Sequence, residues 1–251
     1  MNPIGSPLKA HATRGRYPPL AADREPRGCA QPLRVSDHGY TAAVPLSASD
    51  RSALHDGAVA LGVPLSPQQI DALVRYVDLL LSWNDKVNLT AITNPSAIVD
   101  KHLLDSLAVV PFVARGSRVL DVGTGAGLPS VVLAIARPSV QIIAVESIQK
   151  KVSFVRAVSR ELRLPITVEP IRLEQRKPEP TFDFVVSRAT FEPAEWVTRG
   201  APFVRSGGSL VAMLSAHQLA PDAPAGFVSA AGAEHVLGGA VRRLVRYRNV
   251  R

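Results

Sequence analysis

The chain of 251 residues has a single cysteine, Cys29, and few aromatic side chains, which make up 5% of the residues. One cysteine cannot form a disulfide within the chain, and this argues against a small secreted domain built on disulfides. It also leaves no cysteine cluster for a structural zinc site. No apolar run approaches the roughly 18 residues of a membrane-spanning helix, so we expect no integral membrane protein.

Acidic side chains are in the minority. Lys and Arg number 29 against 21 Asp and Glu, which gives a formal net charge of +8. This surplus favours a polyanionic partner, of which nucleic acid is the simplest. Hydrophobic residues make up 46% of the chain, an ordinary share for a folded protein and too high for a wholly disordered one.

Residues 1–52 differ in composition from the rest of the chain. They contain seven prolines and seven basic residues against four acidic ones, without a helical or strand period. They also lack the apolar segment of a secretory signal. We predict a disordered basic leader over 1–52 and one folded domain over 53–251, of which 53–115 is the N-terminal helical part. An alternative is that translation starts inside the leader, at a codon read here as Val35 or Val44.

Two helices are expected at the start of the domain. A short one ends at Gly62, and a longer one follows Ser66, with Pro67 at its first position and Gln69 completing a capping box. Apolar residues then recur at three- and four-residue steps as far as Trp83, which is typical of an amphipathic helix.

A third helix is expected to carry His102, Asp105 and Ser106, after a polar turn that includes Asn88. The spacing of His102 and Asp105 places both side chains on one face of that helix. A role at a functional site and a purely structural role are equally open for this pair. One His and one Asp are too few ligands for a metal ion, so no metal site is predicted.

The most informative segment is a glycine loop after a short apolar strand at 119–122. Gly123, Gly125 and Gly127 alternate with other residues, and an apolar helix follows at 131–136. Glycine lets the backbone turn sharply and approach a ligand closely. A strand, a glycine loop and the start of a helix form the ligand site of an open α/β sheet.

Two ligand classes use such a loop. Dinucleotide-binding proteins require G-x-G-x-x-G, and here Ser130 takes the place of the last glycine. Asp121 and the three glycines instead resemble the D-x-G-x-G-x-G loop of S-adenosylmethionine-dependent methyltransferases, whose positively charged ligand favours an acid nearby. Glu146, at the end of the strand 141–145, can accept both ribose hydroxyl protons in either class.

Strands and helices alternate along the rest of the chain, which predicts a mainly parallel sheet with helices on its faces. Helical spacing is present at 150–158, and further strands are expected at 166–168, 182–186, 209–214 and, with imperfect alternation, 241–248.

From about Leu54 to Leu214, and more loosely beyond, the chain resembles the bacterial 16S ribosomal RNA guanine-N7 methyltransferases, also called glucose-inhibited division protein B. The motifs that carry this resemblance are Trp83-Asn84, Asn88-Leu89-Thr90, His102 to Ser106, Asp121 to Pro129, Lys150-Lys151 with Phe154, Arg172-Leu173-Glu174 and Ser187-Arg188-Ala189.

The resemblance implies a Rossmann-like class I methyltransferase fold with an N-terminal helical extension. It implies S-adenosylmethionine as cofactor, no metal, and methylation of N7 of a guanine in 16S rRNA of the small ribosomal subunit, in the cytoplasm. We expect a monomer without membrane attachment. The implied cofactor-binding residues are Asp121, Gly123, Gly125, Gly127, Leu128, Glu146, Leu173, Glu174 and Arg188.

The substrate side is expected to include a basic helix face for RNA phosphates, although a merely solvated face is equally open. Arg188 is expected to orient the cofactor or a phosphate, with a structural salt bridge as the alternative. No general acid or base is assigned. The substrate-side residues are Asn88, His102, Asp105, Ser106, Lys150, Lys151 and Arg156.

Three departures from the family pattern keep other functions open. Leu214-Ser215 stands where the family has Lys-Gly, Ser130 replaces a glycine, and the segment after Ala189 is atypical. The alternatives are a diverged paralogue that binds RNA or cofactor without this activity, and a nicotinamide-dependent oxidoreductase.

Overall fold

The computed structural model describes residues 46–251, so the leader prediction for 1–45 lies outside the described residues. The predicted domain start at residue 53 is corrected, because helix α1 (Ala48–Ala60) begins before it. Ser47 and Asp50 form a reciprocal capping box at its start, and both Leu46 and Asp50 are buried. The apolar period that marks a helix in the sequence begins only at Leu54, and for this reason the first turn went unrecognised.

Helix α2 (Pro67–Val87) has the predicted capping box between Ser66 and Gln69. It ends at Asn88, which adopts a left-handed conformation with φ of 48°. The predicted third helix is one continuous helical run, made of α3 (Pro95–Ile98), a π-helical turn (Val99–Leu104) and α4 (Asp105–Leu107).

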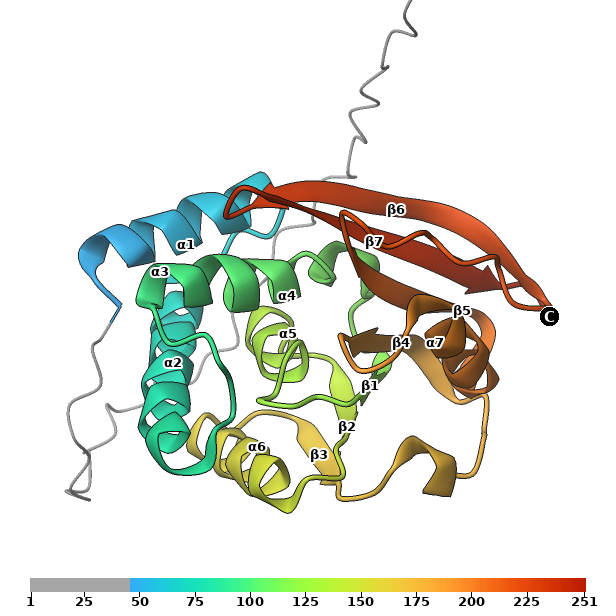
Figure 1. Ribbon diagram of the computed structural model, residues 1–251, viewed down its shortest axis with the longest axis horizontal. Coiled ribbons are helices and arrows are strands. Elements are labelled where there is room, and N and C mark those ends of the chain that lie inside the picture. Colours follow the sequence, from blue (N-terminus) through green and yellow to red (C-terminus); the bar gives the residue numbers. More distant parts are fainter. Residues whose placement is uncertain (1–45) are drawn as a thin grey trace, which may run out of the picture. The chain divides into compact units, whose positions relative to one another are not determined.

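The sheet has seven strands in the order β3-β2-β1-β4-β5-β7-β6 (Figure 1). The four pairs among β1 to β5 are parallel, and β7 pairs antiparallel with both β5 and β6, so the expected mainly parallel sheet is confirmed. The strands are β1 (Arg118–Val122), β2 (Gln141–Val145), β3 (Ile166–Glu169), β4 (Phe182–Arg188), β5 (Val204–Ser215), β6 (Phe227–Leu237) and β7 (Ala240–Asn249).

Helices cover both faces of the sheet, and alternate residues of the central strands point to opposite sides. Val119 of β1 packs into the core beneath the N-terminal helices, whereas Leu120 packs into the core beneath α7. The remaining elements are α5 (Ser130–Ala136), α6 (Gln149–Glu161), α7 (Pro193–Gly200) and 3-10 turns at Val110–Phe112, Leu173–Gln175 and Ala201–Phe203.

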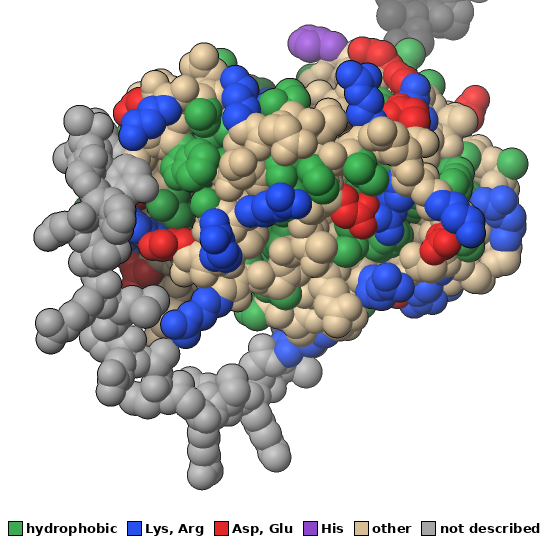
Figure 2. Space-filling view, turned by 90° about the horizontal axis from the view of Figure 1, so that it is seen from below, with side chains coloured by type: hydrophobic (Ala, Val, Ile, Leu, Met, Phe, Trp, Pro, Cys, Tyr) green, Lys and Arg blue, Asp and Glu red, His purple; other side chains and the backbone are tan. Residues whose placement is uncertain are grey.

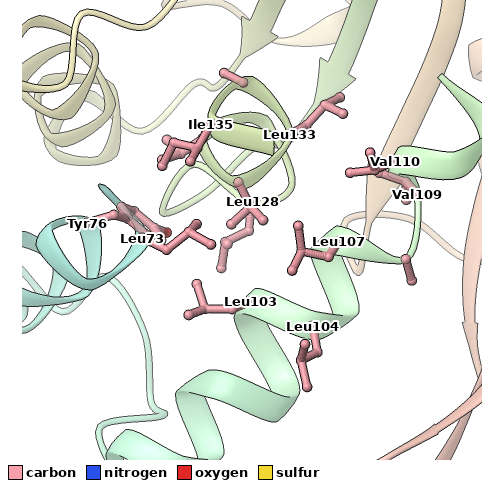
Figure 3. Close-up of a cluster of buried hydrophobic side chains, with 14 of the residues drawn as sticks. Leu73, Tyr76, Leu103, Leu104, Leu107, Val109, Val110, Leu128, Leu133 and Ile135 are labelled. Carbon is pink, nitrogen blue, oxygen red and sulfur yellow. The ribbon is translucent and has the colours of Figure 1, made fainter. Parts of the chain in front are cut away.

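The N-terminal helices pack directly against the helix that follows the glycine loop. Figure 3 shows side chains of α2, of the π-helical turn and of α5 meeting in one buried cluster. Leu73, Leu103 and Leu133 are each fully buried there. The helical extension is therefore part of the same core and fixes the position of the glycine loop. No helix within residues 46–251 is long and apolar enough to cross a membrane.

Candidate functional site

The glycine loop joins β1 to α5, and its three glycines all have positive φ, of 72°, 59° and 89°. A Cβ on Gly123 would lie 2.1 Å from Thr190 Oγ1, and one on Gly127 would lie 2.6 Å from Val131 Cγ2. Packing therefore requires glycine at both positions. A Cβ on Gly125 would meet no atom closer than 3.9 Å, so the middle of the loop is open to a ligand.

Asp121 lies beneath the loop and is completely buried. Its Oδ2 accepts two hydrogen bonds from Ser130, one from the backbone N–H at 3.2 Å and one from the hydroxyl at 2.6 Å. Burial raises the pKa of Asp121 to about 6, while the hydrogen bonds from Ser130 act in the opposite direction. The carboxyl group thus holds the start of α5 against the end of β1. Ser130, a departure from the family pattern, has a defined partner.

Glu146 follows β2 and lies on the other side of the loop. Its Oε2 accepts from Gly125 N–H at 3.0 Å, and its Oε1 accepts from Ile148 N–H at 2.9 Å. A carboxylate has about four lone-pair positions, so each oxygen keeps acceptor capacity for a ligand hydroxyl. The structure thus places this acid against the open glycine, and its role in binding ribose stays a prediction.

Tyr76 of α2 supports the loop and was not recognised from the sequence. Its hydroxyl donates to the carbonyl of Ala126 at 2.8 Å, and the side chain is fully buried. In the sequence, Tyr76 is one more apolar position of an amphipathic helix, and no signal there reveals where its hydroxyl points.

A polar cluster lies beyond the loop, where β4 ends near the π-helical turn. Arg188 donates to Asp105 Oδ2 at 3.0 Å and to the carbonyl of Lys101 at 2.8 Å. Its Nη2 lies 3.3 Å from His102 Nδ1, and Thr90 Oγ1 lies 2.9 Å from His102 Nε2. Burial and the neighbouring guanidinium lower the pKa of His102 to about 4, so its imidazole is neutral at physiological pH.

This cluster forms part of a hollow of about 260 Å³ at the carboxyl ends of β4 and β5. Four cationic side chains line it, with Asp105 as the one carboxylate among the lining residues. Phe191 and Trp196 line it as a stacked pair with ring centroids 5.8 Å apart. The cationic residues are Lys101, Arg188, Arg242 and Arg243.

The hollow and the glycine loop share a wall. Ser187 Oγ donates to the carbonyl of Val122 at 2.8 Å, and Thr190 Oγ1 donates to the carbonyl of Gly123 at 3.3 Å. Ser187 also lines the hollow. A ligand over the loop and a second ligand in the hollow would consequently lie on either side of the end of β4. This arrangement suits the transfer of a group from one ligand to the other.

Comparison with known proteins shows which family the chain belongs to. The family model described as rRNA small subunit methyltransferase G matches residues 69–222, which is more than half of the chain. The chain belongs to this family.

Relatives named ribosomal RNA small subunit methyltransferase G come from several bacteria. The chain is 47% identical over 165 residues to the one from Anaeromyxobacter dehalogenans strain 2CP-1, covering 64% of this chain and 77% of the relative. It is 45% identical over 174 residues to the one from Leptothrix cholodnii, covering 67% and 79%. Family membership confirms the predicted family and enzyme class, and S-adenosylmethionine as the cofactor. It weighs against a nicotinamide oxidoreductase.

Solved structures confirm the predicted fold class. An S-adenosylmethionine-dependent methyltransferase from Aquifex aeolicus matches with a TM-score of 0.51 and 19% identity, over 65% of this chain and 97% of that chain. A Burkholderia thailandensis 1,6-didemethyltoxoflavin-N1-methyltransferase, solved with S-adenosylhomocysteine, matches with a TM-score of 0.51 and 14% identity. The second match covers 75% of this chain and 92% of that chain.

The other predicted cofactor residues lie in two places. Leu128 is buried at the end of the loop, in the core that Figure 3 shows. Leu173 is buried in the 3-10 turn after β3, and the adjacent Glu174 is exposed and paired with Arg199 of α7. Arg188, which the resemblance gives to the cofactor, lies in the hollow with His102 and Asp105, which were predicted on the substrate side.

The remaining substrate-side residues do not line the hollow. Asn88 is exposed at the end of α2, and the buried hydroxyl of Ser106 has no hydrogen-bond partner. Lys150, Lys151 and Arg156 lie on α6, where Arg156 donates to the carbonyl of Val168. Figure 2 shows the side of the domain at the lower edge of Figure 1, where α6 lies, with Lys and Arg side chains spread over it among apolar ones. In residues 46–251, no three His, Cys, Asp or Glu side chains are grouped to hold a metal ion.

Proposed function

We propose that the protein transfers a methyl group from S-adenosylmethionine to N7 of a guanine in 16S rRNA of the small ribosomal subunit. One observation carries this proposal. The glycine loop and a cationic, aromatic-lined hollow share the end of β4 as a common wall. A base in the hollow would thereby lie next to the methyl donor.

The residues around the loop fit this cofactor. Gly125 leaves open space over the loop, and Glu146 offers carboxylate oxygens for ribose hydroxyls beside it. When bound, S-adenosylmethionine supplies an electrophilic methyl group on a positively charged sulfur. Buried Asp121 and Tyr76 would fix the loop beneath it, through Ser130 and Ala126 respectively. We propose that Leu173 and Glu174, in the turn after β3, lie on the adenine side.

Guanine N7 has a lone pair in the ring plane and carries no proton, so its methylation requires no general base. The protein's task is alignment of the two reactants, which can contribute about 7–11 kcal/mol to catalysis. A neutral, doubly hydrogen-bonded His102 suits such a positioning role. Because a hydrogen bond to N7 would block the nucleophile, we assign Arg188 to holding Asp105 and the wall of the hollow.

The RNA substrate must present the target guanine outside a base-paired stack, as is usual for enzymes that modify bases. Phe191 lines the hollow beside Trp196 and offers an aromatic surface to such a base. We further propose that the enzyme acts as a monomer in the cytoplasm, where small ribosomal subunits are found.

The test is transfer of labelled methyl from S-adenosylmethionine to small subunits that lack the native modification, with Gly123→Asp as control. A side chain at Gly123 would collide with Thr190, so this variant should not transfer label. We expect label in 16S rRNA, recovered as 7-methylguanosine. Cofactor binding without transfer would refute the proposal and favour a diverged paralogue, whereas label in another nucleoside would refute the N7 assignment.

A further inference from the structure

The hollow carries two cations whose donors are not used by the protein. Lys101 of the π-helical turn lines it, and its ammonium group has no hydrogen-bond or ion-pair partner in the described part of the chain. The backbone carbonyl of Lys101 accepts from Arg188, so the backbone is anchored while the ammonium group remains available.

Arg242 of β7 lines the same hollow and is only weakly engaged. Its Nε lies 3.9 Å from Asp105 Oδ1, which is beyond hydrogen-bond distance. The other oxygen of Asp105 already accepts from Arg188 at 3.0 Å. The Arg242 side chain keeps 29% of its surface exposed. Its planar set of N–H donors is thus available to a ligand.

The neighbouring Arg243 differs in this respect. Its guanidinium donates to the carbonyls of Ala216 and Gln218, and so ties β7 to the segment after β5. In the ladder between β5 and β7, Ser215 pairs with Arg242 and Leu214 pairs with Arg243. Arg243 therefore shapes the edge of the hollow, whereas Arg242 lines the hollow and keeps its donors free.

We propose that Lys101 and Arg242 together bind one backbone phosphate of the RNA, next to the nucleotide whose base enters the hollow. This inference rests on the proposed function and names the contact that holds the substrate. Guanidinium groups match phosphate oxygens geometrically, and an ammonium group adds a compact charge. Phe191, stacked on the buried Trp196, offers the base an aromatic surface, and the two cations hold the strand that carries the base.

Arg242→Ala, Lys101→Ala and the double variant test the proposal, with Arg248→Ala as the matched control. Arg248 lies on the same strand, is exposed, and does not line the hollow, so its removal changes the net charge equally. Three quantities are measured for each protein: the Kd for S-adenosylmethionine, the Kd for unmodified 16S rRNA at several salt concentrations, and KM and kcat for methyl transfer.

We expect each hollow variant to raise the RNA Kd and KM about tenfold, with the cofactor Kd unchanged. The slope of log affinity against log salt should become shallower by about 0.7–0.9, the value for one phosphate contact. The fold-loss of RNA affinity in the double variant should be smaller than the product of the fold-losses in the two single variants, because both side chains contact one phosphate. Arg242→Lys should restore part of the affinity, and Arg248→Ala should change it by less than about twofold.

Three results would overturn the proposal. The salt slope could remain that of the unmodified protein, Arg248→Ala could lose as much affinity as Arg242→Ala, or the cofactor Kd could rise in the hollow variants. The last result would place the two cations on the cofactor. Failure of the proposed function is distinguishable, because it would appear as absence of methyl transfer by the unmodified protein itself.

Discussion

Removal of the Ser130 hydroxyl should destabilise the protein in a manner that depends on pH. This hydroxyl donates to Asp121 Oδ2 at 2.6 Å in a fully buried setting. Above pH 6 the acceptor is a carboxylate, and a hydrogen bond to a charged group is worth about 1.5–3 kcal/mol. Well below pH 6 the acceptor is a neutral acid, and the bond is worth about 0.5–1.5 kcal/mol. The free-energy cost of Ser130→Ala should therefore grow by about 1 kcal/mol or more from pH 5 to pH 8.

The direction follows from the pKa of Asp121, which burial raises from 3.8 to about 6. Between these values the folded state keeps a proton that the unfolded state has released, so stability falls as the pH rises. Loss of the Ser130 hydroxyl would raise this pKa further, so the fall in stability would extend to higher pH and become larger in total. His102 acts in the opposite direction, because its pKa is lowered from 6.5 to about 4. The variant and the unmodified protein must consequently be compared at each pH.

Urea unfolding at pH 5 and pH 8 measures these costs, with Ser159→Ala as control. The Ser159 hydroxyl is also buried, but it donates to the backbone carbonyl of Val155 at 2.7 Å. Its loss should cost about 1 kcal/mol at both pH values. An equal cost of Ser130→Ala at the two pH values would refute the assignment of Asp121 as a buried group that becomes ionised near pH 6.

Three further predictions concern the loop and the hollow. Tyr76→Phe leaves the buried carbonyl of Ala126 without its partner, so urea unfolding should show a loss of about 1–3 kcal/mol and the cofactor Kd should rise. Gly127→Ala adds a Cβ that would lie 2.6 Å from Val131, at a residue whose φ is 89°. Cofactor binding, measured by calorimetry, should be lost or strongly weakened. Near-normal cofactor affinity would show that the loop adapts. Asp105→Asn removes the charged partner of Arg188. The kcat for methyl transfer should fall at least tenfold, while the Tm changes by only a few degrees. An unchanged kcat would exclude this ion pair from the site.

Local sequence signals predicted the parts of the fold that depend on neighbouring residues. Ser66 and Gln69 mark the start of α2 because a capping box is complete within four residues. The glycines at 123, 125 and 127 mark the loop because all three have positive φ, and close packing also excludes a side chain at 123 and 127. Strand β6 was missed, since it is rich in Ala and Gly, lies at the edge of the sheet and has few buried side chains to produce an alternating pattern.

Contacts between residues distant in sequence could not be predicted in the same way. Arg188 at the end of β4 and Asp105 at the start of α4 are 83 residues apart, and they meet only in the folded chain. The resemblance named both residues but divided them between cofactor and substrate, whereas the structure places them in one ion pair. Tyr76 reaches Ala126 across 50 residues, and its hydroxyl leaves no trace in the hydrophobic period of α2.

The nucleophile is the central claim, and atomic replacement tests it most directly. Once the modified nucleotide in 16S rRNA has been mapped, an RNA is prepared with 7-deazaguanosine at that position, and methyl transfer is compared with that to the same RNA containing guanosine. This replacement removes the N7 lone pair and keeps the rest of the base edge. The account predicts transfer to guanosine and none to 7-deazaguanosine, with similar RNA affinity for both. Transfer to the 7-deaza RNA would contradict it.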